Sequence, residues 1–118
     1  MKISKIKELL DAEVVCCEHL LETEVNSACG SDMMSDVLAF VKDHAVLLTG
    51  LVNPQVVRTA EMMDIKCIVF VRGKIPTENV IELAESMDIV ILTTTERMYV
   101  ACGKLYSNGL EGGSVIES

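Results

Sequence analysis

Aromatic and basic side chains are scarce in this chain, and each scarcity excludes a class of function. Trp is absent and aromatic residues make up 3% of the 118 residues, which weakens the case for binding single-stranded nucleic acid through stacked rings. Ten Lys and Arg stand against 18 Asp and Glu, which gives a formal net charge of −8. A phosphate backbone is bound through a basic face. We therefore expect no nucleic-acid partner.

Long hydrophobic runs and a cysteine framework are also lacking. The longest apolar stretches, such as residues 67–71, have the length of a strand and fall far short of the ~20 residues of a membrane helix. Residues 1–5 lead straight into a charged amphipathic pattern without the apolar core of a signal peptide. Five cysteines at irregular spacings do not pair into a disulfide framework. We expect a cytoplasmic protein with reduced thiols and no membrane partner.

Half of the residues are apolar, which is enough for the core of one domain of this length. Three apolar runs, at residues 45–48, 67–71 and 89–92, show no alternation with polar residues. Such runs are typical of strands that are covered on both faces. We expect one domain over residues 1–110 and a flexible tail over residues 111–118.

Apolar periodicity and capping residues predict helices between these strands. The expected N-caps are Ser4, Asp32, Asn53, Thr77 and Thr95. Asn53 precedes a proline, and this pair favours a helix start because proline lacks only an N–H that has no partner there. A short strand is expected over residues 13–16, a weaker one over 24–28, a helix over 33–41, and the end of the last helix near residues 108–109.

An internal repeat supports this interpretation. Residues 60–65 match residues 84–89 at five of six positions, and the same offset of 24 places Asn53 on Thr77. Repeated strand–helix units imply parallel strands joined by right-handed crossovers. The predicted fold is α/β: a small, mostly parallel sheet with helices on both faces, built from repeated strand–helix units.

Residues 47–61, with the sequence LLTGLVNPQVVRTAE, resemble the middle of DRTGG-domain proteins. The unit from residue 68 to residue 84 does too, and the likeness extends more loosely over residues 1–109. The chain is also similar to the N-terminal domain of HPr kinase/phosphorylase, which lacks that enzyme's catalytic machinery. In DRTGG families the domain accompanies CBS domains, phosphate acetyltransferases and pyrophosphatases, and stand-alone forms occur in anaerobic bacteria. The resemblance implies a regulatory or structural role.

The residues that give the DRTGG family its name are changed in this sequence. Residues 42–44 read Lys-Asp-His where the Asp-Arg-Thr segment is expected, and residues 71–73 read Val-Arg-Gly in place of Thr-Gly-Gly. We therefore do not expect a function tied to that motif from the resemblance.

The candidate ligand site follows from the expected topology. Ligands of open parallel sheets bind beyond the carboxyl ends of the strands, where loops lead into helix N-termini. Helix N-termini together with two cations suit a phosphate or a carboxylate. The same residues also serve as caps and turn residues, and no Walker or Gly-x-Gly-x-x-Gly loop accompanies them. The candidate residues are Thr49, Gly50, Asn53, Arg72, Gly73, Lys74, Thr94 and Thr95.

Metal binding and catalysis have weaker support. Residues 16–19 read Cys-Cys-Glu-His, but adjacent cysteines in a strand point to opposite faces, and a zinc or iron–sulfur site needs convergent ligands. Neither His19 nor His44 has a partner that the sequence identifies. We expect no metal, no cofactor and no catalytic residue.

Methionine is frequent, and Met33, Met34 and Met62 extend beyond the predicted apolar faces. Adaptable methionine surfaces suit self-association, and a covered edge of the core explains them equally well. The sequence favours a homodimeric, non-catalytic regulatory module that senses a small anionic or nucleotide-like metabolite or docks on a partner enzyme. The alternatives are a kinase-like remnant acting on phosphorylated substrates and a redox- or metal-linked accessory protein.

Overall fold

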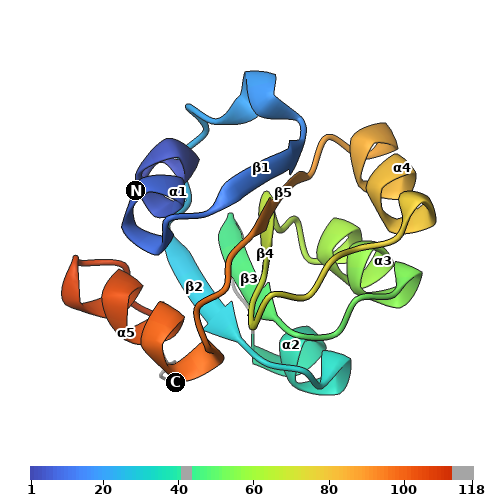
Figure 1. Cartoon of the computed structure of the whole chain (residues 1–118). Coiled ribbons are helices and arrows are strands. Elements are labelled where there is room, and N and C mark those ends of the chain that lie inside the picture. The colour runs from blue at the N-terminus through green and yellow to red at the C-terminus, as the bar shows by residue number, and fades with distance from the viewer. Residues whose placement is uncertain (41–43, 113–118) are drawn as a thin grey trace.

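The computed structural model describes residues 1–40 and 44–112, which form a five-stranded sheet in the order β1-β5-β4-β3-β2 (Figure 1). Strands β2 to β5 are parallel to one another, and β1 is antiparallel to β5. The strands are β1 (Glu13–Cys16), β2 (Ser27–Gly30), β3 (Ala45–Thr49), β4 (Cys67–Phe70) and β5 (Val90–Thr93).

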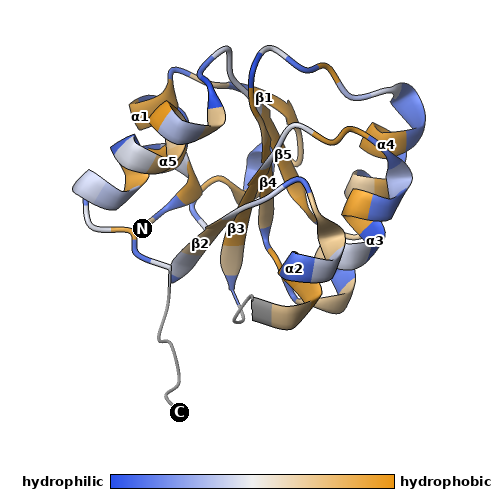
Figure 2. Ribbon diagram, turned by 90° about the horizontal axis from the view of Figure 1, so that it is seen from below, coloured by the Kyte–Doolittle hydropathy of each residue, from blue (hydrophilic) through white to orange (hydrophobic). Residues whose placement is uncertain are grey.

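Helices cover both faces of the sheet. Helices α1 and α5 contact each other on one face, while α2, α3 and α4 form a row on the other (Figure 2). The helices are α1 (Ile3–Leu10), α2 (Met34–Phe40), α3 (Pro54–Met62), α4 (Glu78–Ser86) and α5 (Met98–Ser107), with a short 3-10 turn over Glu18–Leu20. The predicted α/β fold with a mostly parallel sheet is confirmed. No described helix has the length and hydropathy to cross a membrane.

The central strands explain the unbroken apolar runs of the sequence. Every residue of β3 and of β4 is buried, because these strands have a strand on each side and helices above and below (Figure 2). Phe70 in β4 is among the largest fully buried side chains. The hydrophobic core therefore lies along both faces of the sheet, and polar groups are placed where the strands end.

The internal repeat has the same backbone geometry in both copies. Asp64 and Asp88 each follow a helix with the same left-handed φ of 56°. The N–H of Ile65 bonds the carbonyl of Ala60 at 2.8 Å, and the N–H of Ile89 bonds that of Ala84 at 3.0 Å. This is the Schellman arrangement, in which the residue after the left-handed position closes the helix and packs back on it. The repeated six-residue sequence thus forms the same helix C-terminus in both copies.

The predicted caps are partly wrong. Asn53 caps α3 as expected, and its side chain accepts a hydrogen bond from the N–H of Val56 at 3.2 Å. Thr77 occupies the N-cap of α4, but its side chain makes no capping hydrogen bond. Capping by Ser4 is wrong because α1 already begins after Lys2, with its amide groups bonded to the backbone of residues 21 and 23.

The last helix also starts later than predicted. Its N-cap is Arg97 and not Thr95, because the backbone of residues 94–96 is held in hydrogen bonds to the loop that follows β4. The predicted end near residues 108–109 is confirmed, with Gly109 at a left-handed φ of 103°. The weak strand expected over residues 24–28 lies at β2, two to three residues further along.

The end of the domain runs beside the outer strand β2. Leu110 is buried, and the carbonyl of Glu111 accepts a hydrogen bond from the N–H of Ala28 at 3.0 Å. Residues 113–118 of the predicted tail, and Lys42 and Asp43 of the altered motif, lie outside the described residues.

Two glycines of this domain should respond to alanine with opposite signs. A Cβ atom on Gly30 would lie 2.7 Å from the Cys102 Sγ and 3.1 Å from the Met98 Sδ, so Gly30→Ala should lower the free energy of unfolding by about 1–3 kcal/mol. Gly103, inside α5, meets nothing, so Gly103→Ala should raise it by about 0.5–1 kcal/mol. Urea titration measures both, and Cys102→Ala should relieve much of the Gly30→Ala loss. A Gly30→Ala protein as stable as wild type would contradict this packing.

Candidate functional site

Parallel pairing brings the ends of four strands to one edge of the sheet, here called the carboxyl edge. Gly30 pairs with Leu48, and Thr49 pairs with Phe70, which in turn pairs with Thr93. The start of β1 lies at the same edge, since Glu13 pairs with Thr93 in antiparallel register. The loops that carry the predicted site residues therefore lie side by side.

Asp32 holds the loop after β3. Its Oδ1 accepts hydrogen bonds from the N–H of Gly50 at 2.7 Å and from the Thr49 hydroxyl at 3.0 Å. The Thr49 oxygen also accepts from the N–H of Leu51 at 3.1 Å, and Thr49 is fully buried. Thr49 and the Gly50 amide are thus engaged within the protein, and they organise the site rather than offering free donors to a ligand.

This role of Asp32 differs from the predicted helix cap. The N–H of Met33 bonds the Ser31 hydroxyl at 3.0 Å instead. The sequence holds only a local signal, an acidic residue before a helix, and local reasoning assigns such a residue to its own helix. Contact with the loop after β3 depends on the pairing of β2 with β3.

Arg72 lies over Gly50. A Cβ atom on Gly50 would lie 2.0 Å from the Arg72 Nη2, so glycine at this position leaves the space that the guanidinium occupies. Arg72 has a left-handed backbone, with φ of 61°, and its Nη2 lies 3.6 Å from the Asp32 Oδ2. The N–H of Arg72 bonds the carbonyl of Glu96 at 2.7 Å. The site joins residues 32, 50 and 72 into one cluster, here called the Asp32–Arg72 cluster.

The charge of Asp32 is stabilised by this environment. The hydrogen bond from the Gly50 amide lowers the pKa of the Asp32 carboxyl, and the Thr49 hydroxyl and the nearby charges of Arg72 and Lys74 lower it further, against the opposing effect of burial. Asp32 is therefore ionised at neutral pH. One carboxylate accompanies the two cations at this end of the carboxyl edge.

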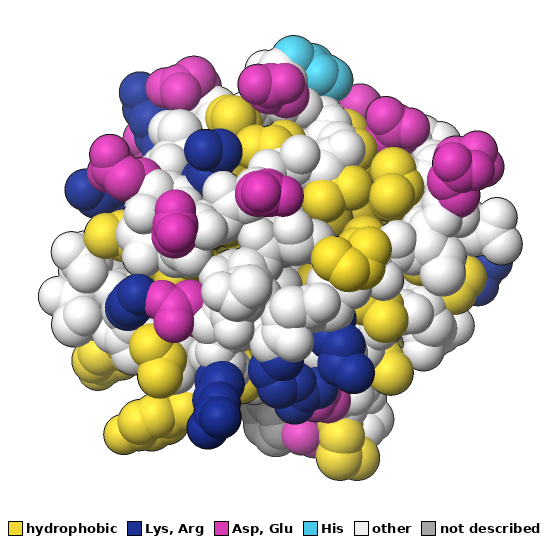
Figure 3. All heavy atoms as spheres, in the orientation of Figure 1, with side chains coloured by type: hydrophobic (Ala, Val, Ile, Leu, Met, Phe, Trp, Pro, Cys, Tyr) yellow, Lys and Arg dark blue, Asp and Glu magenta, His cyan; other side chains and the backbone are white. Residues whose placement is uncertain are grey.

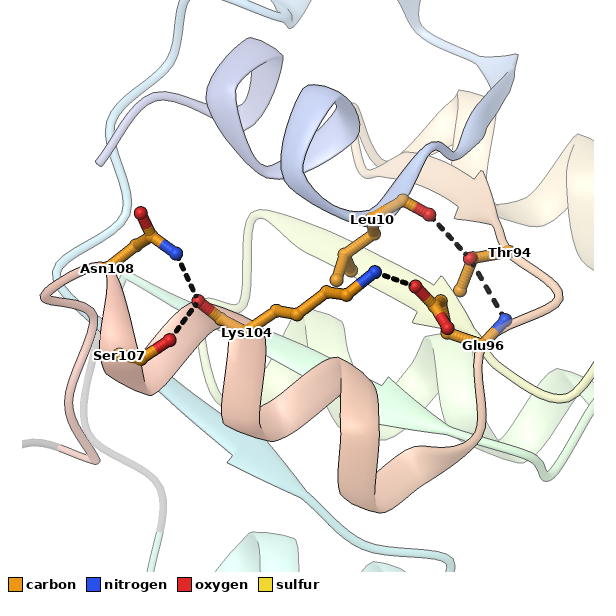
Figure 4. Close-up of polar contacts among 6 residues, drawn as sticks. All are labelled: Leu10, Thr94, Glu96, Lys104, Ser107 and Asn108. Carbon is orange, nitrogen blue, oxygen red and sulfur yellow. Dashed lines mark hydrogen bonds and ion pairs between the residues drawn. The ribbon is translucent and has the colours of Figure 1, made fainter.

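Thr94 has an internal role, like Thr49. Its hydroxyl donates to the carbonyl of Leu10 at 2.8 Å and accepts from the N–H of Glu96 at 3.2 Å (Figure 4), and it is buried. Glu96 also pairs with Lys104 of α5. Thr94 therefore fastens the end of α1 to the loop after β5. Thr95 is exposed.

A cavity of about 340 Å³ opens at the carboxyl edge, beside the start of β1. The N–H of Gly73 bonds the carbonyl of Thr94 at 2.9 Å, which places the loop after β4 at the cavity wall. Two of its residues, Asp11 and Glu13, were not among the predicted site residues, because only the antiparallel pairing of β1 brings them here. The lining residues are Asp11, Glu13, Gly73, Ile75, Thr93, Thr94 and Thr95.

Some of the Lys and Arg side chains lie near one another along the lower edge of the molecule, in the region where Figure 1 places the carboxyl ends of the parallel strands, while others lie among carboxylates elsewhere on the same face (Figure 3). Arg72 and Lys74 are both exposed in the loop after β4. In a protein with net charge −8, these two exposed cations lie at the carboxyl edge among the carboxylates of Asp11, Glu13 and Asp32.

Cys16 and Cys67 lie at the other end of the sheet from this cluster. Burial raises the pKa of the Cys16 thiol to about 12 and also raises that of Cys67. A reactive or metal-binding cysteine needs an accessible thiolate, so burial disfavours such a role for these two. Among residues 1–40 and 44–112, no three His, Cys, Asp or Glu side chains are grouped so that they could hold a metal ion. His44 lies 3.3 Å from Asp64, a residue that follows α3 and precedes β4.

Fold and site together define a class: a small open α/β domain whose carboxyl edge carries polar loops, cations and a cavity. The chain belongs to the DRTGG domain family, whose sequence pattern matches residues 5–106. This confirms the resemblance seen in residues 47–61.

The fold is shared with a solved regulatory protein. The structure of the CBS and DRTGG domains of the regulatory region of Clostridium perfringens pyrophosphatase, complexed with its activator diadenosine tetraphosphate, superposes with a TM-score of 0.69 at 16% identity. The match covers 88% of this chain and 45% of that one, so the chain spans less than half of that regulatory region. No curated protein matches the sequence.

Asp32→Asn should destabilise the protein in a pH-dependent way. The pKa of Asp32 is lowered in the folded state, so its contribution is fully present above the ordinary pKa of ~3.9 and is lost as the pH falls through the folded value. We expect a loss of up to about 1 kcal/mol at pH 7, because the side chain is 44% exposed. The difference from wild type should shrink below pH ~4.

Urea titrations at pH 7 and pH 3 measure this difference. Asp36→Asn is the matched control, because it removes the same charge from an exposed position in α2. A loss that persists unchanged at pH 3 would show that the charge of Asp32 is not what holds the loop.

Proposed function

We propose that this protein is a non-catalytic regulatory module that binds a small anionic or nucleotide-like metabolite at its carboxyl edge. The observation that carries the proposal is the placement of Arg72 and Lys74, both exposed, beside the loops of β3 and β5. Of the predicted ligand residues, Arg72, Gly73, Lys74 and Thr95 are the exposed ones. The other four make hydrogen bonds within the protein that hold their loops in place: Thr49, Gly50, Asn53 and Thr94.

The Asp32–Arg72 cluster supports a sensing role. The two charged groups are 3.6 Å apart and each side chain is 44% exposed, and ion pairs of this kind contribute only ~0–1 kcal/mol. An anionic ligand competes with Asp32 for Arg72 at little energetic cost. Ligand binding then removes the contact between Arg72 and the Asp32 Oδ2, while the Oδ1 keeps its hydrogen bonds to Gly50 and Thr49, and so changes the charge beside the loop that leads into α3.

The comparison with the pyrophosphatase region supports the same class of function. That protein is a regulatory region crystallised with a nucleotide activator, and the 45% of it that matches has the fold of this chain. We propose that this domain works in the cytoplasm and passes a ligand signal to a partner enzyme by docking. No catalytic role is part of the proposal.

Isothermal titration with inorganic pyrophosphate tests the anion site. Lys74→Gln and Arg72→Asn should each weaken binding by about tenfold, since each removes a charge-assisted contact. Asparagine is chosen for position 72 because it tolerates the left-handed backbone there. Arg58→Gln, which removes a cation from the exposed surface of α3, should leave the affinity unchanged.

Asp32→Asn should change the affinity for pyrophosphate in the opposite direction. It removes the competing carboxylate, so pyrophosphate should bind more tightly than to wild type. Equal losses in all three cation variants would indicate a general charge effect rather than a site. Absence of binding by pyrophosphate and by nucleoside phosphates would refute the proposed function.

We further propose that the module is a homodimer that associates through α5. Tyr99 is 89% exposed, Tyr106 65% and Val100 42%, and Tyr99, Gly103 and Tyr106 share one face of the helix. Helix α5 contains no carboxylate, so two copies of an acidic protein meet there with little repulsion. A two-fold axis near residues 102–103 places Tyr99 of one copy beside Tyr106 of the other.

Tyr99→Glu should dissociate this dimer. One helix face buries less than the ~800 Å² per partner of a standard interface, so we expect reversible, concentration-dependent dimerisation in sedimentation velocity. Met62, 61% exposed on α3, provides the matched control, because Met62→Glu adds the same charge to an exposed apolar position. Dissociation by Met62→Glu alone would place the interface on the α3 side, as the methionine pattern of the sequence suggests.

A further inference from the structure

The cavity beside β1 has a chemistry that an anion site alone does not explain. Its lining combines two exposed carboxylates, Asp11 and Glu13, with the hydroxyl-bearing residues 93–95. Ile75, on the same wall, is 72% exposed, which is unusual for a large aliphatic side chain in this domain. The volume of about 340 Å³ falls within the ~300–1,000 Å³ of small-molecule sites.

The cavity adjoins the two cations of the carboxyl edge. Gly73, which lines it, stands between Arg72 and Lys74 in the chain. Hydrogen bonds from Arg72 to Glu96 and from Gly73 to Thr94 hold that loop against the loop after β5. The carboxyl edge thus presents carboxylates and an apolar side chain in the cavity, and two cations on either side of Gly73 at its wall.

The arrangement of the carboxylates, Ile75 and the two cations indicates which kind of ligand would fit. Two carboxylates repel a bare phosphate or pyrophosphate, but carboxylates accept hydrogen bonds from ribose hydroxyls in nucleotide-binding α/β folds. A ligand that satisfies both sets of groups carries hydroxyl donors and an apolar ring at one end and phosphates at the other.

We infer that the cavity holds the nucleoside part of a ribonucleoside phosphate. Asp11 and Glu13 accept hydrogen bonds from the ribose hydroxyls, Ile75 covers the base, and the phosphates extend toward Arg72 and Lys74. This assignment rests on the proposed anion site and adds the part of the ligand that gives specificity.

Isosteric substitutions separate the two parts of the site. Asp11→Asn keeps a residue that tolerates the left-handed φ of 49° at this position, and Glu13→Gln keeps the side-chain shape. Each should weaken the binding of ADP about tenfold, while the affinity for inorganic pyrophosphate stays the same or rises because a repelling charge is gone. Glu18→Gln removes the same charge from an exposed residue beyond the other end of β1 and should change neither affinity.

A ligand series completes the test by calorimetry on the wild-type protein. ADP should bind about tenfold more tightly than 2′,3′-dideoxy-ADP, which lacks the hydroxyl donors. Equal affinities for the two, with pyrophosphate still bound through Arg72, would overturn the inference and leave the anion site standing. Binding of spermidine that depends on Asp11, without binding of ADP, would instead identify a cation site and overturn it. Absence of all phosphate binding would remove both the inference and the proposed function.

Discussion

The parallel alignment of β2 to β5 places the ends of four strands, and the loops that follow them, at one edge of the sheet. The inner strands β3 and β4 have a strand on each side and are fully buried, so their backbone groups and apolar side chains are satisfied within the sheet. Polar loops can then adopt strained conformations at the edge, as Arg72 does with its left-handed backbone. The cluster, the cavity and the cations all depend on this alignment.

Some polar residues at the carboxyl edge hold the loops in place, and others are exposed to solvent. Thr49 and Thr94 are buried and use their hydroxyls in internal hydrogen bonds, whereas Arg72 and Lys74 reach solvent. The support is electrostatic as well as geometric, because Asp32 organises the loop of Gly50 and also faces Arg72. A ligand of the proposed kind would meet Arg72 beside the carboxylate that also fixes the β3–α3 loop.

Two exposed regions differ from the rest of the acidic surface: the carboxyl edge and the outer face of α5. Cations at the carboxyl edge suit an anionic ligand, and the uncharged tyrosine face of α5 suits a second copy of the chain. Helix α5 lies against α1 on one face of the sheet, while the Asp32–Arg72 cluster joins the ends of β3 and β4 to the start of α2. The proposed ligand and the proposed second copy of the chain therefore use different parts of the protein.

The sequence by itself determined the buried strands, the helix after Asn53 and the repeated helix ends, because unbroken apolar runs, a capping asparagine before proline and a matched six-residue segment are local signals. It also identified the loops of Thr49, Arg72 and Thr94 through the rule for parallel sheets. Tertiary structure alone decided that Asp32 accepts hydrogen bonds from the loop after β3 instead of capping its own helix. It also decided that Asp11 and Glu13 lie at the carboxyl edge. These placements depend on which strands pair and in which direction. Pairing between segments far apart in the chain cannot be predicted from the residues of either segment alone.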